Sequence, residues 1–486
     1  MALRRRIAPA SVVVVMLTVS VGVAPQAAAE PCTAAAAQPV APAAQNVQTA
    51  PWQPIQGSPR NTDPAPSSPP TGHKPQGASE SAPLPNLGQL SRTMLSAIDP
   101  RTGQVQQQAA VAPVPKPSPA PSVTAPQVIE PAPVAGPAPA AAPPGTSLVG
   151  WVTGPDSPND TIGRFAITGT DLGIMWDNGT GGQVLMAFGD TYGYCDVKGQ
   201  QWRYNTLFRT ADKSLAKTVS VPNGALGNPT SGAPMLQPAV AKQIVNSPYW
   251  ATYEKGIIPT AGIAHAGKQY MSFMSIKSWD ANGSWTTNFS GIAVSPDNGE
   301  NWGIYPNSVR LAGADRVPGG RFMPGNENFQ QGAFLKPGPG DPYLYSFGTP
   351  AGRGGSAFVS RVMAGALPDL TRYEYWNGDQ NSWVPADPGA ATPVIPGPVG
   401  EMSAQYNTYL KQYVALYCNG ADDVVMRTAS APQGPWGPPQ LLVPSSQYPG
   451  GIYAPYLHPW STGKELYFNL SLWSAYNVML MRTVLP

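Results

Sequence analysis

The sequence has few of the residues that usually carry metal, redox or nucleic-acid chemistry. Its 486 residues include only three cysteines and three histidines, and their spacing matches neither a zinc site nor a disulfide scaffold. Charged residues make up 12%, with 29 Lys and Arg against 27 Asp and Glu, so a basic surface for nucleic acid is not expected. The chain also lacks a phosphate-binding glycine loop and a G-x-S-x-G nucleophile motif. We therefore predict no cofactor, no metal and no nucleic-acid partner.

Residues 1–29 are typical of an export signal. Three arginines at positions 4–6 precede an apolar core at Val12–Val23, and Ala27–Ala29 forms a cleavage site. The core is too short to span a bilayer, and no other apolar run reaches about 18 residues. An uncleaved anchor is the alternative interpretation. We expect the mature protein to be secreted or held in the cell envelope, without stable membrane insertion.

The mature chain divides into two parts of different composition. Residues 30–146 hold 26 of the 59 prolines and one aromatic side chain, Trp52, so this Pro/Ala-rich segment is predicted to be a disordered spacer. Residues 147–486 hold 43 of the 44 aromatic side chains and are predicted to be the folded domain. In an oxidising compartment, Cys195 and Cys418 of this domain are available to form a disulfide.

The folded domain is predicted to be all-β. Apolar runs of four to seven residues, such as Val184–Gly189 and Tyr413–Tyr417, alternate with turns rich in Gly, Pro, Asn and Asp. These runs group into five degenerate repeats of about 65 residues, the length of a four-stranded blade with loops. We therefore predict a five-bladed β-propeller, with a two-sheet sandwich as the alternative.

Ser295–Trp302 reads S-P-D-N-G-E-N-W and resembles the Asp-box of sialidase-like propellers. Asp297 is placed to accept hydrogen bonds from turn amides, Gly299 permits the turn, and Trp302 is expected to pack between blades. Ser430–Trp436 resembles a proline-containing counterpart. We interpret both segments as structural, so Asp297 is not a catalytic candidate.

Two aspartates form the strongest catalytic candidate. Asp171 begins one predicted strand, Asp190 ends the next, and a hairpin can bring both carboxyl groups to one rim. Paired carboxyl groups are what glycosidic cleavage requires, because one protonates the leaving oxygen while the other activates water or attacks the sugar. The alternative is that both aspartates only cap turns.

Further candidates follow from the same context. Glu401, flanked by glycine and apolar residues, and Glu327, in a polar loop, are additional candidate acids, with a structural role as the alternative for each. Candidate substrate-binding residues are aromatic platforms, for which blade packing is the alternative, and nearby polar groups. They are Trp176, Tyr192, Trp473, His265, Gln405 and Tyr406.

The motifs "TDLGIMWDNG", "FGDTYG", "GIAVSPDNGENW", "GEMSAQYN" and "APQGPW" resemble a family of exported mycobacterial proteins. That family was long catalogued as a domain of unknown function and is now classed among glycoside hydrolases as endo-D-arabinanases. The resemblance covers residues 147–486 and implies a five-bladed propeller that cuts internal α-linkages in the D-arabinan of arabinogalactan and lipoarabinomannan. It also implies that Asp171 is the base or nucleophile, Asp190 its partner, and Glu401 a third acid or substrate contact.

Two other function classes stay open. A sialidase-like exo-glycosidase would gather several arginines around its mouth, and the candidates are Arg164, Arg203, Arg209, Arg353 and Arg427. A non-catalytic propeller that binds cell-wall polysaccharide would hold Asp171 and Asp190 far apart or saturate both with backbone hydrogen bonds. The expected function is an exported glycoside hydrolase whose partner is cell-wall D-arabinan.

Overall fold

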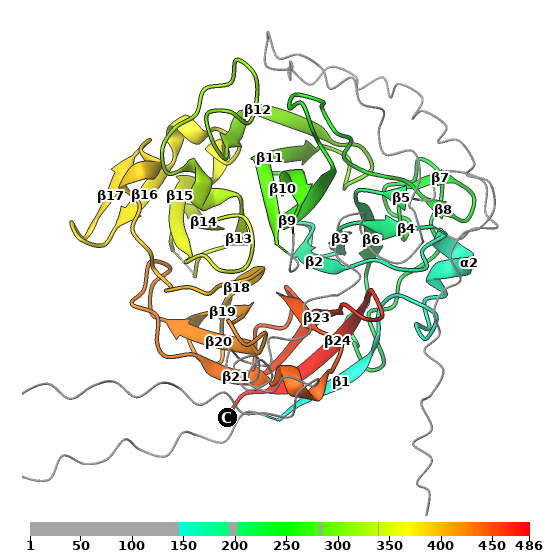
Figure 1. Cartoon of the computed structure of the whole chain (residues 1–486). Coiled ribbons are helices and arrows are strands. Elements are labelled where there is room, and N and C mark those ends of the chain that lie inside the picture. The colour runs from blue at the N-terminus through cyan, green and yellow to red at the C-terminus, as the bar shows by residue number, and fades with distance from the viewer. Residues whose placement is uncertain (1–144, 194–201, 281–283, 339) are drawn as a thin grey trace, which may run out of the picture.

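The computed structural model describes residues 145–193, 202–280, 284–338 and 340–486, and these form a five-bladed β-propeller (Figure 1). The fold predicted from the sequence is therefore confirmed. The predicted leader and most of the predicted spacer lie outside the described residues. Within the described ranges, no helix has the length and apolarity needed to cross a membrane.

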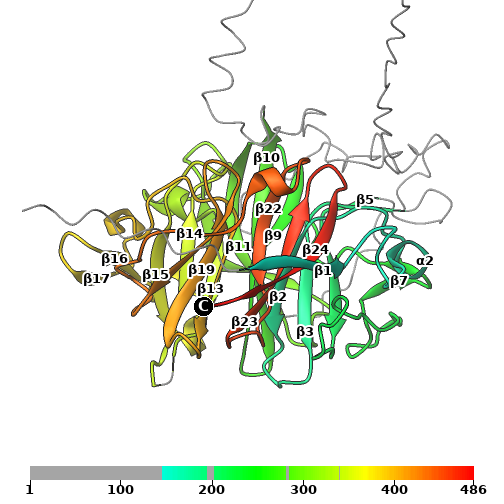
Figure 2. The same ribbon diagram turned by 90° about the horizontal axis from the view of Figure 1, so that it is seen from below.

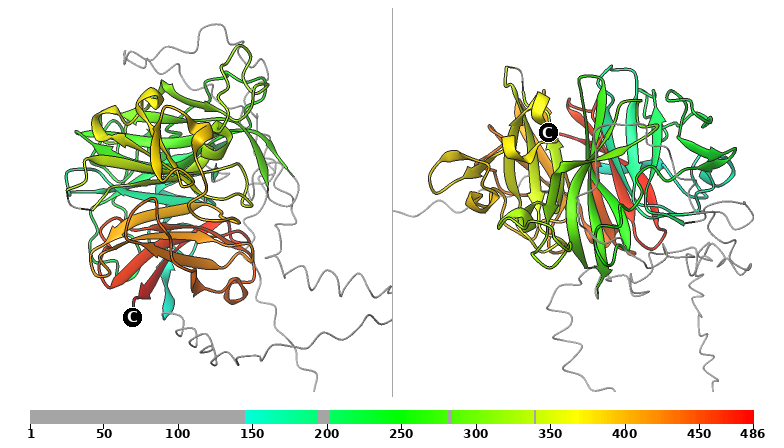
Figure 3. Two further views of the ribbon diagram at one scale, coloured as in Figure 1. Left: turned by 90° about the vertical axis from the view of Figure 1, so that its left-hand side faces the viewer. Right: turned by 90° about the horizontal axis from the view of Figure 1, so that it is seen from above.

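Five sheets surround a central channel, and their strands run through the thickness of the disc (Figures 1, 2 and 3). In the order from inner to outer strand, the blades are β2 (Leu172–Asp177), β3 (Val184–Phe188) and β6 (Thr206–Thr210); β9 (Gly256–His265), β10 (Lys268–Trp279), β11 (Trp285–Ser295) and β12 (Gly303–Leu311); β13 (Gln331–Leu335), β14 (Tyr343–Thr349), β15 (Phe358–Met363), β16 (Glu374–Asn377) and β17 (Ser382–Pro385); β18 (Met402–Asn407), β19 (Gln412–Cys418), β20 (Val424–Ala429) and β21 (Gln440–Val443); and β22 (Ile452–Leu457), β23 (Glu465–Leu472), β24 (Asn477–Val484) and β1 (Thr146–Trp151). Every pair within a blade is antiparallel.

Short elements connect and cover the blades. Two small ribbons flank the first blade: β4 (Thr191–Tyr192) with β5 (Trp202–Arg203), and β7 (Met235–Gln237) with β8 (Val240–Ala241). The helical turns are α2 (Thr161–Phe165), η2 (Asn326–Phe329), η3 (Ala364–Ala366), η4 (Leu370–Arg372), η5 (Pro388–Ala390) and η6 (Ser445–Gln447).

The ring is closed by the two ends of the domain. β1 pairs with β24, from Thr146 opposite Thr483 to Trp151 opposite Met479. The last blade therefore takes its outer strand from the beginning of the domain, and Figure 1 shows the C-terminus beside this strand. This pairing joins segments more than 300 residues apart, and the sequence pattern did not reveal it.

Apolar side chains fill the spaces between neighbouring blades. One cluster joins Met186 and Phe208 of the first blade to Leu480 of the last. Another joins Leu416 of β19 to Phe468 of β23. Because each blade packs on both faces, some of its strands, such as β3 and β13, are buried along their whole length, which explains the short continuous apolar runs in the sequence.

The Asp-box makes the local contacts predicted for it. The Ser295 hydroxyl donates to Asp297 Oδ1 at 2.8 Å, and the Asn301 amide donates to the same oxygen at 2.8 Å. Gly299 has a φ of 83°, which glycine adopts without strain. Trp302 is buried and meets the Trp176 ring of the neighbouring blade edge-on at 6.4 Å.

The second motif packs in the same way. Trp436, after β20, meets the ring of Phe347 in β14 at 5.8 Å. The two tryptophans therefore each join one blade to the blade before it in the chain, which is a structural role.

Candidate active site

A cavity opens at the end of the channel where the five inner strands begin. Asp171 directly precedes β2, Glu401 directly precedes β18, and Gln331 is the first residue of β13. Because all five inner strands run in the same direction, their first residues meet at one mouth. We call this the acid mouth. It is lined by Asp171, Leu172, Asp190, Ile258, Pro259, Thr260, Met274, Trp279, Ser284, Trp285, Gln331, Gly332, Arg353, Glu401, Tyr453, Tyr456, Trp473 and Tyr476.

The carboxyl group of Asp171 is held on one side only. Tyr453, in the neighbouring inner strand β22, donates a hydrogen bond from its hydroxyl to Asp171 Oδ2 at 2.9 Å. The other oxygen, Oδ1, is buried and accepts no hydrogen bond from any residue that the structure describes. A Cβ at position 189 would lie 2.5 Å from this oxygen, so the space that Oδ1 occupies depends on Gly189.

The surroundings of Asp171 make its proton labile near neutral pH. Burial raises the pKa of this carboxyl from 3.8 to about 7, against the lowering effect of the Tyr453 hydrogen bond. The negative charge of Glu401 raises it further, and Arg353 opposes that contribution. A group that titrates near the working pH is suited to proton transfer.

Asp190 lies beside Asp171 and is more deeply buried, with a side chain only 1% exposed. Burial raises the pKa of this carboxyl well above its usual value, the charge of Asp171 raises it further, and a hydrogen bond from Trp202 opposes both. That bond runs from the indole Nε1 to Asp190 Oδ1 at 3.0 Å. Both carboxyl groups are therefore held to their protons more strongly than an exposed aspartate is.

Glu401 is tied to an arginine. Arg353 donates from Nε to Glu401 Oε2 at 2.9 Å and from Nη2 to Oε1 at 2.6 Å, a bidentate pair. The guanidinium lies 5.1 Å from the centre of the Tyr453 ring and 5.0 Å from that of Trp285. Because Tyr453 binds Asp171, a continuous set of contacts connects Glu401 to the aspartate pair.

Aromatic rings form the walls of the acid mouth. Trp279 meets Trp285 edge-on at 6.3 Å, and Trp473 meets Tyr476 edge-on at 5.8 Å. Among the described residues, the buried indole nitrogens of Trp279 and Trp285 have no hydrogen-bond partner. Rings with unsatisfied donors suit a polyhydroxylated ligand, because its C–H faces pack on the rings while its oxygens accept hydrogen bonds.

The structure brings some of the predicted site residues together at this mouth. Asp171, Asp190, Glu401 and Trp473 line it directly. Tyr192 is buried just behind it and meets the ring of Tyr476 at 5.6 Å.

Four other predicted residues lie elsewhere. Trp176, Gln405 and Tyr406 line a second cavity at the opposite end of the channel, and the Trp176 indole donates to Gln269 at 2.9 Å. His265 is the last residue of β9, beyond that second cavity.

Glu327 lies away from both cavities. It belongs to the helical turn η2, and its Oε2 accepts a hydrogen bond from the Gly325 amide at 2.8 Å. The structure thus gives it a local role in its own turn and does not bring it to the aspartate pair.

Three residues of the acid mouth were not predicted from the sequence to belong to a site with the two aspartates. Tyr453 and Trp285 were not singled out, and Arg353 was considered only as part of an arginine cluster. Each comes from a different blade than Asp171, and no local motif marks any of them.

The arginines of the described residues do not form a cluster for a substrate carboxylate. Arg353 alone among the five candidates lines the acid mouth. Arg203 donates to backbone carbonyls such as that of Ala241, and Arg209 pairs with Glu300 at 2.8 Å. Arg164 and Arg427 also donate to backbone carbonyls. The group of arginines around the mouth that would favour a sialidase-like site is therefore not found among the described residues.

Neither aspartate accepts a hydrogen bond from the backbone through its carboxyl group in the described residues: the contacts come from Tyr453 and Trp202. This removes one feature expected of a non-catalytic propeller. Cys418 is buried and has no disulfide partner among the described residues, and its predicted partner Cys195 lies outside them, so the predicted pairing stays a prediction. Within the described part of the chain, no group of three His, Cys, Asp or Glu side chains is arranged to hold a metal ion.

Residues 156–482 match the family model described as a domain of unknown function, DUF4185. The chain belongs to this family. The match covers most of the folded domain, but the family description carries no activity, so the resemblance to endo-D-arabinanases stays a prediction.

Known proteins similar to this chain are distant. Notoamide biosynthesis cluster protein J' of Aspergillus versicolor is 26% identical over 331 residues, which cover 64% of this chain and 83% of that protein. A putative hydrolase from Bacteroides ovatus is similar in structure, with a TM-score of 0.44, 14% identity and coverage of 67% of this chain and 88% of that one. The catalytic domain of a Coprinopsis cinerea GH62 α-L-arabinofuranosidase has a TM-score of 0.39 at 11% identity, over 70% of this chain and 97% of that one. At such scores, a likeness does not carry an activity from one protein to another.

Proposed function

We propose that this protein is a glycoside hydrolase that cleaves internal α-linkages of cell-wall D-arabinan. The observation that carries the enzymatic part is the pair Asp171 and Asp190, two adjacent carboxyl groups with raised pKa values at an aromatic-lined channel mouth. The substrate and the endo mode of action rest on the resemblance of the sequence motifs. The leader-like N-terminus supports export to the cell envelope, where the substrate would be found.

The two aspartates would divide the chemistry by their protonation states. Asp190, the more deeply buried of the two, would act in its protonated form and donate the proton to the glycosidic oxygen as the bond between that oxygen and the anomeric carbon breaks. Ionised Asp171 would take a proton from a water molecule as the water oxygen attacks the anomeric carbon. One water is consumed, Asp171 ends protonated and Asp190 ends ionised, and a proton transfer through solvent restores both.

The remaining groups of the mouth would orient the aspartates and the sugar. The Tyr453 hydroxyl fixes Oδ2 of Asp171, while Oδ1 accepts no hydrogen bond within the described residues. Arg353 is engaged by Glu401 and packs over the Tyr453 ring, so this pair acts as a support for Tyr453 rather than as a second acid. The unsatisfied indole nitrogens of Trp279 and Trp285 would donate to sugar oxygens.

The test is product analysis with the full-length protein and mycobacterial arabinogalactan. The native protein should release oligo-arabinosides, and an Asp171→Asn Asp190→Asn double variant should release none. A Glu327→Gln variant is the matched control, because Glu327 lies outside both cavities and should retain activity within about twofold. Products from the double variant would assign the chemistry to other acids, and no products from the folded native protein would favour a binding propeller.

A further inference from the structure

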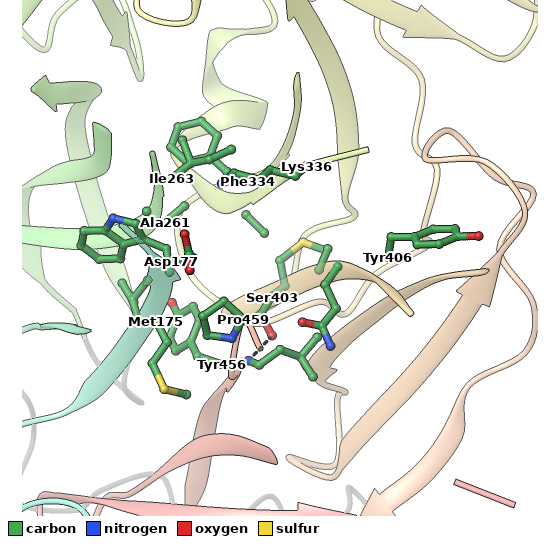
Figure 4. Close-up of a pocket in the computed structure, with 18 of the residues that line it drawn as sticks. Met175, Asp177, Ala261, Ile263, Phe334, Lys336, Ser403, Tyr406, Tyr456 and Pro459 are labelled. Carbon is green, nitrogen blue, oxygen red and sulfur yellow. Dashed lines mark hydrogen bonds between the residues drawn. The ribbon is translucent and has the colours of Figure 1, made fainter. Parts of the chain in front are cut away.

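A second cavity of about 210 Å³ opens at the other end of the channel, where the inner strands finish (Figure 4). All five inner strands contribute to it, including Asp177 at the end of β2, Ile263 near the end of β9 and Lys336 just after β13. We call this the far mouth. Its volume far exceeds the roughly 15 Å³ that one water molecule requires, so it can admit an organic ligand.

The far mouth is separate from the acid mouth. The two cavities share only Thr260 and Tyr456, and the Tyr456 hydroxyl donates to the Thr260 carbonyl at 3.4 Å. These two residues therefore form a floor between the mouths. A ligand at one mouth does not occupy the other.

Most of the far mouth is apolar, with a few polar groups at its edge. Ile174, Met175, Ala261, Phe334 and Leu457 are among the apolar residues that line it. An apolar pocket with a small number of placed polar groups is the usual form of a small-molecule site.

Three of the polar groups have hydrogen-bonding capacity left over. Lys336 keeps access to solvent, and no hydrogen bond or ion pair holds its ammonium in the described residues. Asp177 accepts from the Trp460 indole at 2.5 Å and from the Gly179 amide at 2.7 Å, which leaves lone pairs on both oxygens. Gln405 donates from its side-chain amide to the Ser461 carbonyl, and its own side-chain oxygen accepts no hydrogen bond within the described part of the chain.

Lys336 and Asp177 carry opposite charges that interact electrostatically, but the two side chains form no ion pair in the described residues. Desolvation by the cavity wall lowers the pKa of the Lys336 ammonium, and the charge of Asp177 partly offsets this. A ligand that contacts both groups must offer an acceptor to Lys336 and a donor to Asp177, and the two opposite charges favour neither a cation nor an anion over a neutral ligand. Sugar hydroxyl groups meet this requirement, and the C–H faces of a sugar suit the apolar walls.

We propose that the far mouth is a second carbohydrate site, which binds a neutral oligosaccharide end and does not cleave it. Among the residues that the structure describes, Asp177 is the only one with a carboxyl group that lines this mouth, so they do not supply the acid pair needed for glycosidic cleavage there. Two segments, 171–177 and 401–406, each reach both mouths, which places the catalytic candidates and the second site on the same two inner strands.

Calorimetric titration of the full-length Asp171→Asn Asp190→Asn variant separates binding from hydrolysis. The probes are tetrasaccharides of α-linked D-arabinose, D-galactose and D-mannose, with benzoate as a small apolar anion. At least one tetrasaccharide should bind, and adding Lys336→Met should weaken that binding at least tenfold. The matched control is Lys268→Met, which removes an exposed lysine at the β9–β10 hairpin that does not line the cavity. It should leave binding unchanged.

Two results would overturn the second site. One is that no tetrasaccharide binds in a way that depends on Lys336, and the other is that benzoate alone does. Neither result bears on hydrolysis at the acid mouth, which the product analysis tests separately. Conversely, a protein that binds a tetrasaccharide through Lys336 but releases no products would retain the second site and lose the proposed hydrolase activity.

Discussion

The two mouths of one channel are built from the same five strands but differ in how their charged groups are held. At the acid mouth, Asp171 and Asp190 lie together in a buried environment, and Glu401 is neutralised by a bidentate arginine. At the far mouth, one carboxylate and one lysine face a cavity without pairing. Burial and ion pairing of the charged groups, more than the residue types, therefore decide which end of this propeller is equipped for proton transfer.

The largest expected effect is the loss of activity at the acid mouth. Asp171→Asn or Asp190→Asn should lower kcat by about 10³-fold or more, because each removes a proton-transfer group from the reaction. Lys336→Met, at the far mouth, is predicted to weaken binding without a comparable loss in kcat. Steady-state kinetics on a soluble arabinan would measure both effects. An equal loss of kcat in the acid-mouth and far-mouth variants would contradict the proposed difference between the two mouths.

The next effect is on stability. Arg353→Met would leave the carboxylate of Glu401, whose side chain is only 7% exposed, without its partner, at a cost of about 3 kcal/mol. The double variant Arg353→Met Glu401→Gln should recover much of this loss. Denaturant unfolding measures both.

The matched control for that experiment is an exposed ion pair. Arg482→Met breaks the contact with Glu465, where the side chains are 37% and 48% exposed, and should hardly move the unfolding midpoint. An equal loss in both single variants would show that the Arg353 pair has no special role at the acid mouth.

A smaller effect concerns the pH dependence of the reaction. Tyr453→Phe removes the hydrogen bond that favours ionised Asp171, so the pKa of this carboxyl should rise above about 7. If ionised Asp171 is the base, the acidic limb of the kcat/KM profile should move up by about 1 pH unit, because a hydrogen bond to a charge contributes about 1.5–3 kcal/mol. Tyr467→Phe, on β23 away from both cavities, is the control. An unshifted limb with a uniformly lower kcat would assign Tyr453 a purely structural role.

The last effect is on the pH dependence of stability. The folded state holds the Asp171 proton up to about pH 7, whereas the unfolded chain releases it near the ordinary value of 3.8. Stability therefore falls as pH rises through this window, and Asp171→Asn should remove that part of the fall. Relative to the native protein, the variant should gain up to about 4 kcal/mol of stability between pH 4 and pH 8, because a shift of about 3 pKa units corresponds to that free energy. Thermal unfolding at both pH values measures the difference, and a gain that is equal at both would contradict the assigned burial.

The fold was predictable because its signals are local. Strand runs, turn residues and the Asp-box lie within single hairpins, as do Asp171 and Asp190, which lie at the ends of the paired strands β2 and β3. The closing pair of β1 and β24 and the contact of Tyr453 with Asp171 join residues far apart in the chain. Nothing in a short motif encodes such contacts.

The misplaced binding residues have a geometric cause. A strand advances about 3.3 Å per residue, so Trp176 lies about 16 Å along β2 from Asp171. Gln405 and Tyr406 are separated from Glu401 in the same way along β18. Neighbours in the motif therefore reach opposite mouths, and closeness in sequence is a poor guide to a shared site when the strand spans the whole channel.

The most direct test of the difference between the mouths is a crystal structure of the Asp171→Asn Asp190→Asn variant soaked with an α-linked D-arabinose tetrasaccharide. We predict that a glycosidic oxygen lies within hydrogen-bond reach of position 190, with the neighbouring anomeric carbon facing position 171. A tetrasaccharide found at the far mouth alone would contradict the assignment of the chemistry to the acid mouth.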